Sequence, residues 1–111
     1  MAARKRRKER IVCISFQPDG SLHAEPDSVK VRRGNLVRWV TIARDARIEI
    51  LFNKKRRGSP FEDKVFTSPS HGQVLSAPVR KDAEYGKYPY TVILTVGKCE
   101  VKLDPDVEVQ P

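Results

Sequence analysis

The sequence predicts a single all-β domain, an antiparallel β-sandwich. Apolar and polar residues alternate along many short stretches, which is the pattern of a strand with one buried face. No stretch of eleven residues repeats its apolar positions at helical spacing, and turn-forming residues separate the stretches at regular intervals. A chain of 111 residues is long enough for one modest hydrophobic core and too short for two.

Five strands are expected in the first half of the chain. The alternating stretches are residues 11–17, a stretch that begins near residue 22, and residues 28–32, 36–42 and 47–52. Turn chemistry separates them at residues 18–21 (Pro-Asp-Gly-Ser) and 33–35 (Arg-Gly-Asn). The fourth stretch places Trp39 on the same face as Val37 and Thr41, so the single tryptophan is expected in the interior.

The second half begins with a long loop region, residues 53–72, that contains a basic run and a Ser-Pro-rich piece. Residues 73–79 are expected to return as a strand, and residues 80–85 to form one helical turn before a corner at Gly86. The strand after this corner has one apolar face, made of Tyr88, Tyr90, Val92 and Leu94. Pro89 implies an edge or a bulge there, because proline cannot donate to the ladder. A turn at residues 97–98 leads into the last strands.

The two cysteines, Cys13 and Cys99, are too few and too far apart for a CxxC redox or zinc motif. A small protein in a reducing compartment keeps such thiols free, so a disulfide between them is the minor alternative. Cys99 alternates in phase with Val101 and Leu103 and is expected in the core. Cys13 is out of phase with Val12 and is expected on the opposite face of the first strand.

The chain is basic, with 22 Lys and Arg against 14 Asp and Glu and a formal charge of +8. Residues 1–10 hold six of these cations and one acid, so a basic disordered tail is expected ahead of a domain spanning residues 11–111. The tail and a second basic run at residues 54–57 can contact the phosphates of a polyanion such as nucleic acid. The alternative is a solvated tail that aids solubility. The candidate polyanion-binding residues are Arg4, Lys5, Arg6, Arg7, Lys8, Arg10, Lys54, Lys55, Arg56 and Arg57.

No apolar run approaches the roughly 18 residues that a membrane-spanning helix needs. No apolar segment follows the basic start in the way that a secretory signal requires. The chain is therefore expected to be cytoplasmic and to have no membrane span.

Two segments resemble the cupredoxin family of copper-binding β-sandwiches. Residues 28–31 (Ser-Val-Lys-Val) and 33–39 (Arg-Gly-Asn-Leu-Val-Arg-Trp) resemble that family's succession of a strand, a turn and a hydrophobic strand. Gly86, Tyr88 and Tyr90 resemble the glycine–tyrosine corner before its last core strands. The match covers roughly residues 25–110, and it implies a Greek-key sandwich similar to plastocyanin and azurin.

The same resemblance implies where copper ligands would stand, and this chain lacks them. Plastocyanin-like members hold the metal with two His, one Cys and usually an axial Met. The first His position falls near Ile48, the Cys position at Val92 and the second His position near Thr95, and no methionine follows the first residue. Cys99 is the nearest thiol and has no neighbouring histidine. No copper and no other cofactor is expected, and electron transfer by copper is excluded.

No active site is expected either. His23 and His71 have no partner at a recognisable metal-ligand spacing. Ser59, Ser68 and Ser70 lie near His71 in sequence, but a nucleophile elbow needs a strand-turn-helix context that is missing here. The chain is therefore expected not to be an enzyme.

Two function classes stay open. The first is a copper-free, non-catalytic cupredoxin-like module that binds a protein partner, with residues 54–72 as a loop surface on a rigid scaffold. The second is polyanion binding through the basic tail and residues 54–57. Phe61 and Phe66 flank that run, and few other aromatics remain to stack on bases. The sequence identifies neither the partner nor the oligomeric state.

Overall fold

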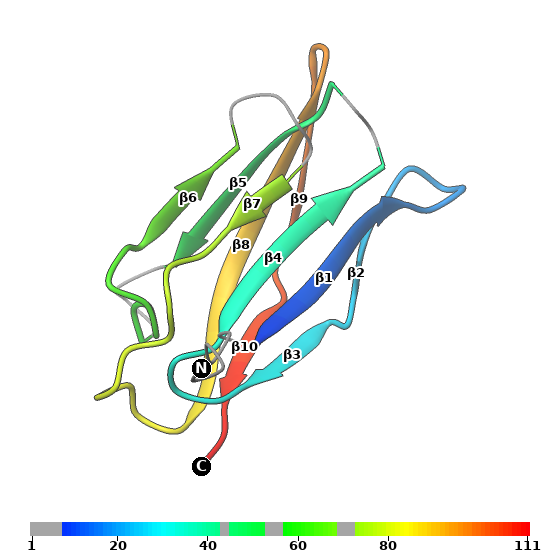
Figure 1. Cartoon of the computed structure of the whole chain (residues 1–111). Helices are drawn as coiled ribbons and strands as arrows, with labels where there is room; N and C mark the ends of the chain where they lie inside the picture. The colour runs from blue at the N-terminus through cyan, green and yellow to red at the C-terminus, as the bar shows by residue number, and fades with distance from the viewer. Residues whose placement is uncertain (1–7, 43–44, 53–56, 69–72) are drawn as a thin grey trace, which may run out of the picture.

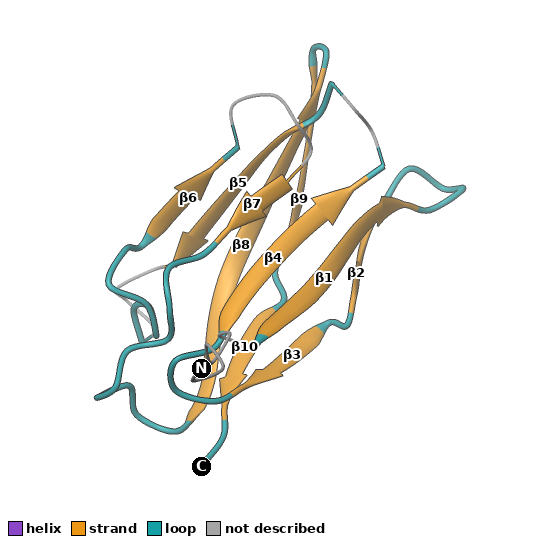
Figure 2. Ribbon diagram, in the orientation of Figure 1, coloured by secondary structure: helices purple, strands orange, loops and turns teal. Residues whose placement is uncertain are grey.

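The computed structural model describes residues 8–42, 45–52, 57–68 and 73–111, and these form two β sheets that pack face to face (Figures 1 and 2). No helix occurs among these residues, which confirms the all-β prediction. The strands are β1 (Glu9–Phe16), β2 (Leu22–Glu25), β3 (Ser28–Val31), β4 (Leu36–Thr41), β5 (Arg47–Phe52), β6 (Val65–Thr67), β7 (Gln73–Leu75), β8 (Gly86–Val96), β9 (Cys99–Leu103) and β10 (Asp106–Val109).

Both sheets are mixed, so the prediction of a purely antiparallel sandwich is wrong. One sheet has the order β2-β1-β4-β7, and the other has the order β3-β10-β8-β5-β6 with β9 also paired to β8. Strands β1 and β4 run parallel, and so do β10 and β3. Each parallel pair joins strands that are far apart in sequence order, and a local alternation pattern contains no information on which strand will become a neighbour.

A long hairpin of β8 and β9 belongs to the second sheet. Strand β8 pairs with β9 along residues 92–96 and with β10 along residues 86–89, in one continuous register. Gly97, at φ 61°, makes the sharp turn between the two arms. Pro89 lies in this central strand. Tyr90 N–H donates to the Pro105 carbonyl, so the missing N–H of Pro89 faces the other side, beyond the last residue of β5, Phe52. The predicted edge or bulge at Pro89 stays a prediction, because the position opposite it on the β5 side, residue 53, lies outside the described residues.

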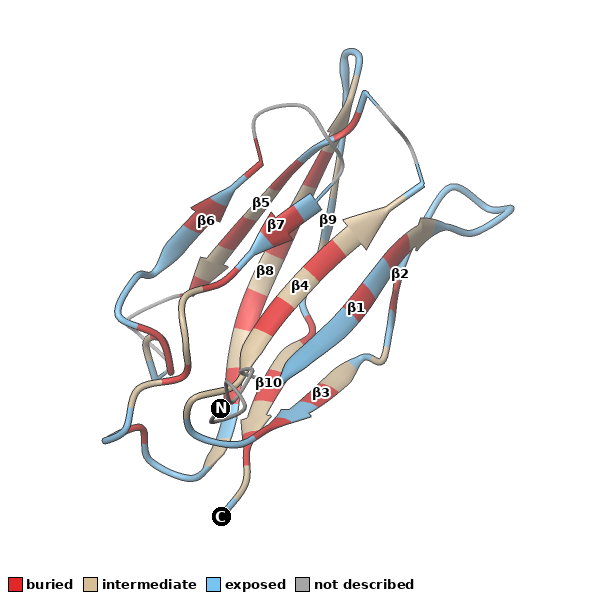
Figure 3. Cartoon of the chain, in the orientation of Figure 1, coloured by how far each residue is buried: buried red, intermediate tan, exposed pale blue. Residues whose placement is uncertain are grey.

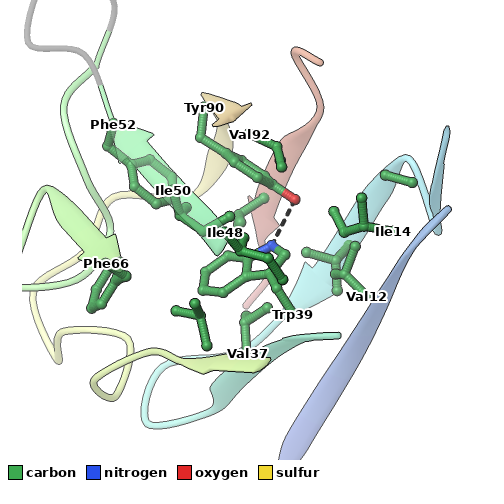
Figure 4. Close-up of a cluster of buried hydrophobic side chains, with 14 of the residues drawn as sticks. Val12, Ile14, Val37, Trp39, Ile48, Ile50, Phe52, Phe66, Tyr90 and Val92 are labelled. Atoms are coloured by element: carbon green, nitrogen blue, oxygen red, sulfur yellow. Dashed lines mark hydrogen bonds between the residues drawn. The ribbon is translucent and has the colours of Figure 1, made fainter. Parts of the chain in front are cut away.

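The core lies between the two sheets, and the burial pattern alternates along the strands (Figure 3). Trp39 of β4 is fully buried, as predicted, and packs edge-on against Tyr90 of β8 and Phe61. Its Nε1–H donates a hydrogen bond of 2.9 Å to the Tyr90 hydroxyl across the two sheets (Figure 4). The predicted apolar faces of β5 and β8 are also buried; they consist of Ile48, Ile50, Phe52, Tyr88, Tyr90, Val92 and Leu94.

The structure differs from the predicted elements at four places, one of which is the expected loop region at residues 53–72, where Val65–Thr67 form β6. Strand β1 begins at Glu9 instead of residue 11, so the last part of the expected tail belongs to the domain, whereas residues 1–7 lie outside the described residues. Strand β7 ends at Leu75 instead of residue 79, because Pro78 has no N–H to continue a ladder. Residues 80–85 form no helical turn; one reverse turn, with Ala83 N–H donating to the Arg80 carbonyl, replaces it.

The placement of Cys99 in the core was also wrong, because its side chain is exposed. Cys99 does lie on the core-facing side of β9, in phase with the partly buried Val101 and Leu103. The tip of the β8–β9 hairpin extends past the strands of the opposite sheet, so no described strand of that sheet covers Cys99 (Figure 3). Cys13 is exposed on the outer face of β1, as predicted, and both thiols are free.

Candidate functional site

One end of the sandwich is built from two loops that are hydrogen-bonded to each other. The turn between β3 and β4 and the segment between β7 and β8 exchange backbone bonds, since Gly34 N–H donates to the Val79 carbonyl and Val79 N–H donates to the Asn35 carbonyl, both at 2.9 Å. The Arg80 N–H then donates to the Pro60 carbonyl at 2.9 Å. These bonds hold residues 77–85 against the end of the sandwich that lies at the lower edge of Figure 1.

Arg33 is the first of three arginines that hold this segment. Its Nε and Nη2 both donate to the Ala83 carbonyl, at 3.0 and 2.7 Å. The guanidinium also lies over the ring of Tyr85, with 4.4 Å between its central carbon and the ring centroid. A cation over an aromatic face is attracted by the negative potential of the ring. The positive charge of Arg33 is thus fixed beside a half-exposed aromatic side chain.

Arg57 holds the other end of the segment. Its Nη1 donates to the carbonyls of Tyr85 and Lys87, at 3.3 and 3.4 Å, and its central carbon lies 4.5 Å from the ring centroid of Tyr88. The Tyr88 hydroxyl in turn donates to the Glu84 carbonyl at 2.7 Å. Gly86, at φ 120°, allows this close approach, because a Cβ there would lie 2.5 Å from Nη1 of Arg57.

Arg80 is the third arginine. Its Nη2 donates to the Ser59 carbonyl at 2.9 Å, and its Nε, a buried atom, has no hydrogen-bond partner among the described residues. A cleft of about 420 Å³ opens beside it, lined by Arg57, Arg80, Asp82, Glu84 and Tyr88.

The positive charge of these arginines is only weakly compensated. Backbone carbonyls are neutral, so a guanidinium that binds them keeps its net charge. Two acids do approach: Glu84 lies 3.3 Å from Arg57, and Asp82 lies 3.9 Å from Arg80. The side chains of Asp82 and Glu84 are more than 80% exposed, at 82% and 86%, and such surface ion pairs contribute little. Arg32, Lys81 and Lys87 are exposed at the same end, and their side chains have no ion-pair partner in the part of the chain that the structure describes.

The structure places only three of the ten candidate polyanion-binding residues. Arg57 belongs to the arginine-held end just described. Lys8 lies at the same end, since its carbonyl accepts from Leu36 N–H at the start of β4. Arg10 lies elsewhere, in β1 facing a groove beside β3. The other candidates, Arg4, Lys5, Arg6, Arg7, Lys54, Lys55 and Arg56, fall outside the described residues.

The aromatic side chains available at this end also differ from those expected from the sequence. Phe61 and Phe66 are buried against Trp39, so neither is available to stack on a base. Tyr85, half exposed beside Arg33, is the aromatic that sequence reasoning missed at this end. Its local sequence signal is its place at the end of a charged run, Arg-Lys-Asp-Ala-Glu-Tyr at residues 80–85.

The three positions where the sequence resemblance would place copper ligands differ in burial. Ile48 and Val92 are fully buried, whereas Thr95 faces outward from β8. His23 is exposed on β2, with its Nε2 3.3 Å from Glu25, and His71 lies outside the described residues. Within residues 8–42, 45–52, 57–68 and 73–111, no three His, Cys, Asp or Glu side chains come together as metal ligands would.

None of the described residues belongs to a helix with the length and hydropathy that crossing a membrane requires. Comparison with known proteins finds no protein-family model and no curated protein that matches this chain, so no family is assigned to it.

Proposed function

We propose that this chain is a copper-free, cupredoxin-like sandwich that acts as a non-catalytic binding module, and that its arginine-held end binds a polyanion. The arginine-held end comprises Arg33, Arg57 and Arg80 together with the exposed cations Arg32, Lys81 and Lys87. One observation carries the proposal: carbonyls of residues 83–87 hold Arg33 and Arg57, the Ser59 carbonyl holds Arg80, and among the described residues Arg57 alone of the three also donates to a carboxylate, that of the exposed Glu84, so the three charges are pre-positioned and only weakly compensated.

Pre-positioning matters because a flexible cation loses conformational freedom when it binds a phosphate. A guanidinium already held by its neighbours loses less of that freedom. Tyr85, beside Arg33, adds a ring on which a base can stack. Single-stranded nucleic acid, which offers phosphates and unpaired bases together, therefore suits this end better than a duplex does.

The cupredoxin-like part of the proposal is supported by the strand arrangement. Chain segments cross repeatedly between the two sheets, for example from β4 to β5 and from β6 to β7, and such crossings are typical of a Greek-key sandwich. Aliphatic side chains at Ile48 and Val92 leave the family's His and Cys positions without donor atoms, so the proposed module has no electron-transfer role. The absence of enzymatic activity and the cytoplasmic location stay predictions.

The test is fluorescence anisotropy of a labelled oligothymidylate with the full chain over a range of salt concentrations. The informative variant is Arg32→Gln/Lys81→Gln/Lys87→Gln, because these three side chains are exposed and hold no part of the fold among the described residues. Each lost phosphate contact reduces the salt slope by about 0.7 for single strands, so three contacts reduce it by roughly 2.

The matched control is Arg47→Gln/Lys98→Gln/Lys102→Gln, which removes the same charge from exposed positions of the other end of the sandwich. An equal loss of affinity in both triple variants would mean that only net charge matters. A third variant with Arg4, Lys5, Arg6 and Arg7 replaced by Gln in the full-length chain measures the contribution of the N-terminal segment. If oligothymidylate binding is lost in this N-terminal variant and persists in Arg32→Gln/Lys81→Gln/Lys87→Gln, the contact belongs to the N-terminal segment and not to the arginine-held end.

Protein binding through residues 54–72 stays a second prediction. The described part of that segment contains a compact turn, in which the Ser59 hydroxyl donates to the Asp63 carbonyl at 2.7 Å and accepts from Phe61 N–H at 3.0 Å. Phe61 anchors this turn in the core. The turn is therefore a rigid base for the loop, which is the property that a binding loop requires.

A further inference from the structure

A second surface of the molecule has open strand edges. A groove of about 680 Å³ runs between the first residues of β1 and strand β3, on the side of the sandwich away from Arg57. It is lined by Glu9, Arg10, Ile11, Pro26, Ser28, Val29, Lys30 and Gln110. The groove exists because the chain leaves the first sheet after β2 and enters the second sheet as β3, so β2 covers only the later part of β1 (Figure 1).

Among the described residues, no strand pairs with the groove-facing edge of the first residues of β1. The Lys8 carbonyl accepts from Leu36 N–H, so it faces β4. Successive residues of a strand turn their backbone groups to opposite edges, so the N–H and C=O of Glu9 and Ile11 face the groove. Strand β2 ends opposite Cys13 and does not reach them.

The β3 wall is open in the same way. Asp106 N–H donates to the Asp27 carbonyl and Gln110 N–H to the Val31 carbonyl, so the odd-numbered residues of this strand face β10. The backbone groups of Ser28 and Lys30 therefore face the groove. Within the described part of the chain, β10 is the only strand that pairs with β3.

The uncompensated charge in the groove is positive. Arg10 and Lys30 are exposed, and neither has an ion-pair or hydrogen-bond partner within the described residues. The one acid, Glu9, is held by Arg38, whose Nη2 and Nε donate to its two carboxylate oxygens at 2.8 and 3.1 Å. These hydrogen bonds lower the pKa of Glu9, so it stays ionised and paired. The apolar lining residues include Val29, which is buried on the core side of β3, and Ile11, which is 52% exposed on the outer face of β1.

We propose that this groove binds an extended acidic segment of a partner protein, which adds to the sheet as a strand along β3. Backbone pairing with Ser28 and Lys30 supplies the affinity that any extended peptide would have. Lys30, on the outer face of β3, attracts carboxylates on the outward-facing residues of that peptide, and Arg10, in phase with the buried Val12 of β1, adds to the positive potential from across the groove. Strand β3 is the paired edge because it carries no acid, whereas the β1 edge carries Glu9. The groove shares no lining residue with the arginine-held end, and this proposal does not depend on the function proposed for that end.

The probe is a fluorescein-labelled, end-capped peptide of alternating Glu and Val, which is acidic and favours an extended conformation. We expect it to bind the full chain in an anisotropy titration, and we expect hydrogen exchange of the Ser28 and Lys30 amides to slow in the complex. The double variant Arg10→Glu/Lys30→Glu should bind about tenfold more weakly, since two attractions become repulsions. Both side chains are exposed, so the reversal does not disturb the core.

The control variant is Arg47→Glu/Lys102→Glu, which makes the same charge change at exposed positions away from the groove and should leave peptide affinity within about twofold. A control peptide with Pro at every Val position cannot pair as a strand and should not bind. Equal binding of the Pro peptide, equal weakening in the control variant, or unchanged exchange at Ser28 and Lys30 overturns the proposal. Displacement of the peptide by an oligothymidylate whose own binding needs Arg10 and Lys30 would assign the groove to nucleic acid. A dimer in sedimentation that the groove variant dissolves would assign it to a second copy of this chain.

Discussion

Trp39 and Tyr90 form the one hydrogen bond between side chains that joins the inner faces of the two sheets among the described residues. Trp39 lies on β4 and Tyr90 on β8, and the bond of 2.9 Å is fully enclosed by apolar neighbours (Figure 4). A buried indole N–H needs an acceptor, because an unpaired polar group in the core is costly. The pair therefore sets the relative position of the sheets as well as filling space between them.

Tyr90→Phe removes the acceptor and keeps the ring, so we expect it to destabilise the fold by about 1–3 kcal/mol. Urea denaturation followed by tryptophan fluorescence measures this, with an unchanged slope against denaturant. The matched control is Tyr88→Phe, which removes a hydroxyl that binds only the Glu84 carbonyl at the more exposed end of the same strand. A Tyr90→Phe variant as stable as the parent would show that Trp39 finds another acceptor.

Tyr90 also predicts how stability depends on alkaline pH. Burial raises the pKa of its hydroxyl well above the ordinary value near 10. Because the folded-state pKa is the higher one, the full contribution is present below about pH 10 and is lost as pH rises from there towards the folded-state pKa, with a slope of about 1.4 kcal/mol per pH unit. Denaturation at a series of alkaline pH values should show this loss in the parent chain. The Tyr90→Phe variant should show a shallower decline over the same range, and parallel curves would contradict the assignment to Tyr90.

Gly86→Ala should disturb both the fold and the arginine-held end. A φ of 120° is strained for alanine, and the new Cβ would push Arg57 away from Tyr88. We expect a loss of about 1–3 kcal/mol in unfolding free energy and weaker oligothymidylate binding. Gly20→Ala is the control, since it also has a positive φ, 87°, but opens onto free space far from the arginines. It should lose stability without losing oligonucleotide affinity.

Both cysteines should react with a thiol reagent in the native protein. Cys13 and Cys99 are exposed and free, so two thiols should be modified at similar rates without denaturant. Single Cys→Ser variants would identify each phase. A slow second phase that requires unfolding and disappears in Cys99→Ser would show that Cys99 is buried, which would contradict the structure.

The faces of individual strands could be predicted because alternation is a local property. Trp39, Ile48 and Val92 follow from their neighbours in sequence, and the structure buries each of them. Cys99 shows the limit of the method, since its phase is correct but burial also depends on whether another layer covers that position. The candidate site was predicted only at Arg57 and Lys8. Arg33 was missed because its partner carbonyl, Ala83, lies 50 residues away in sequence, and Arg80 because its partner, Ser59, lies 21 residues away.

The sequence by itself determined the all-β class, the inner face of most strands and the excess of positive charge. These properties depend on residue type and on the two-residue alternation of apolar side chains, and both can be read directly from the sequence. Only the tertiary structure decided the parallel pairing of β1 with β4 and of β3 with β10, the clustering of three arginines at one end of the sandwich, and the open groove between β1 and β3. Each of these depends on contacts between residues far apart in the chain. Such contacts form when the whole core is buried, and the alternation pattern within any one strand does not encode them.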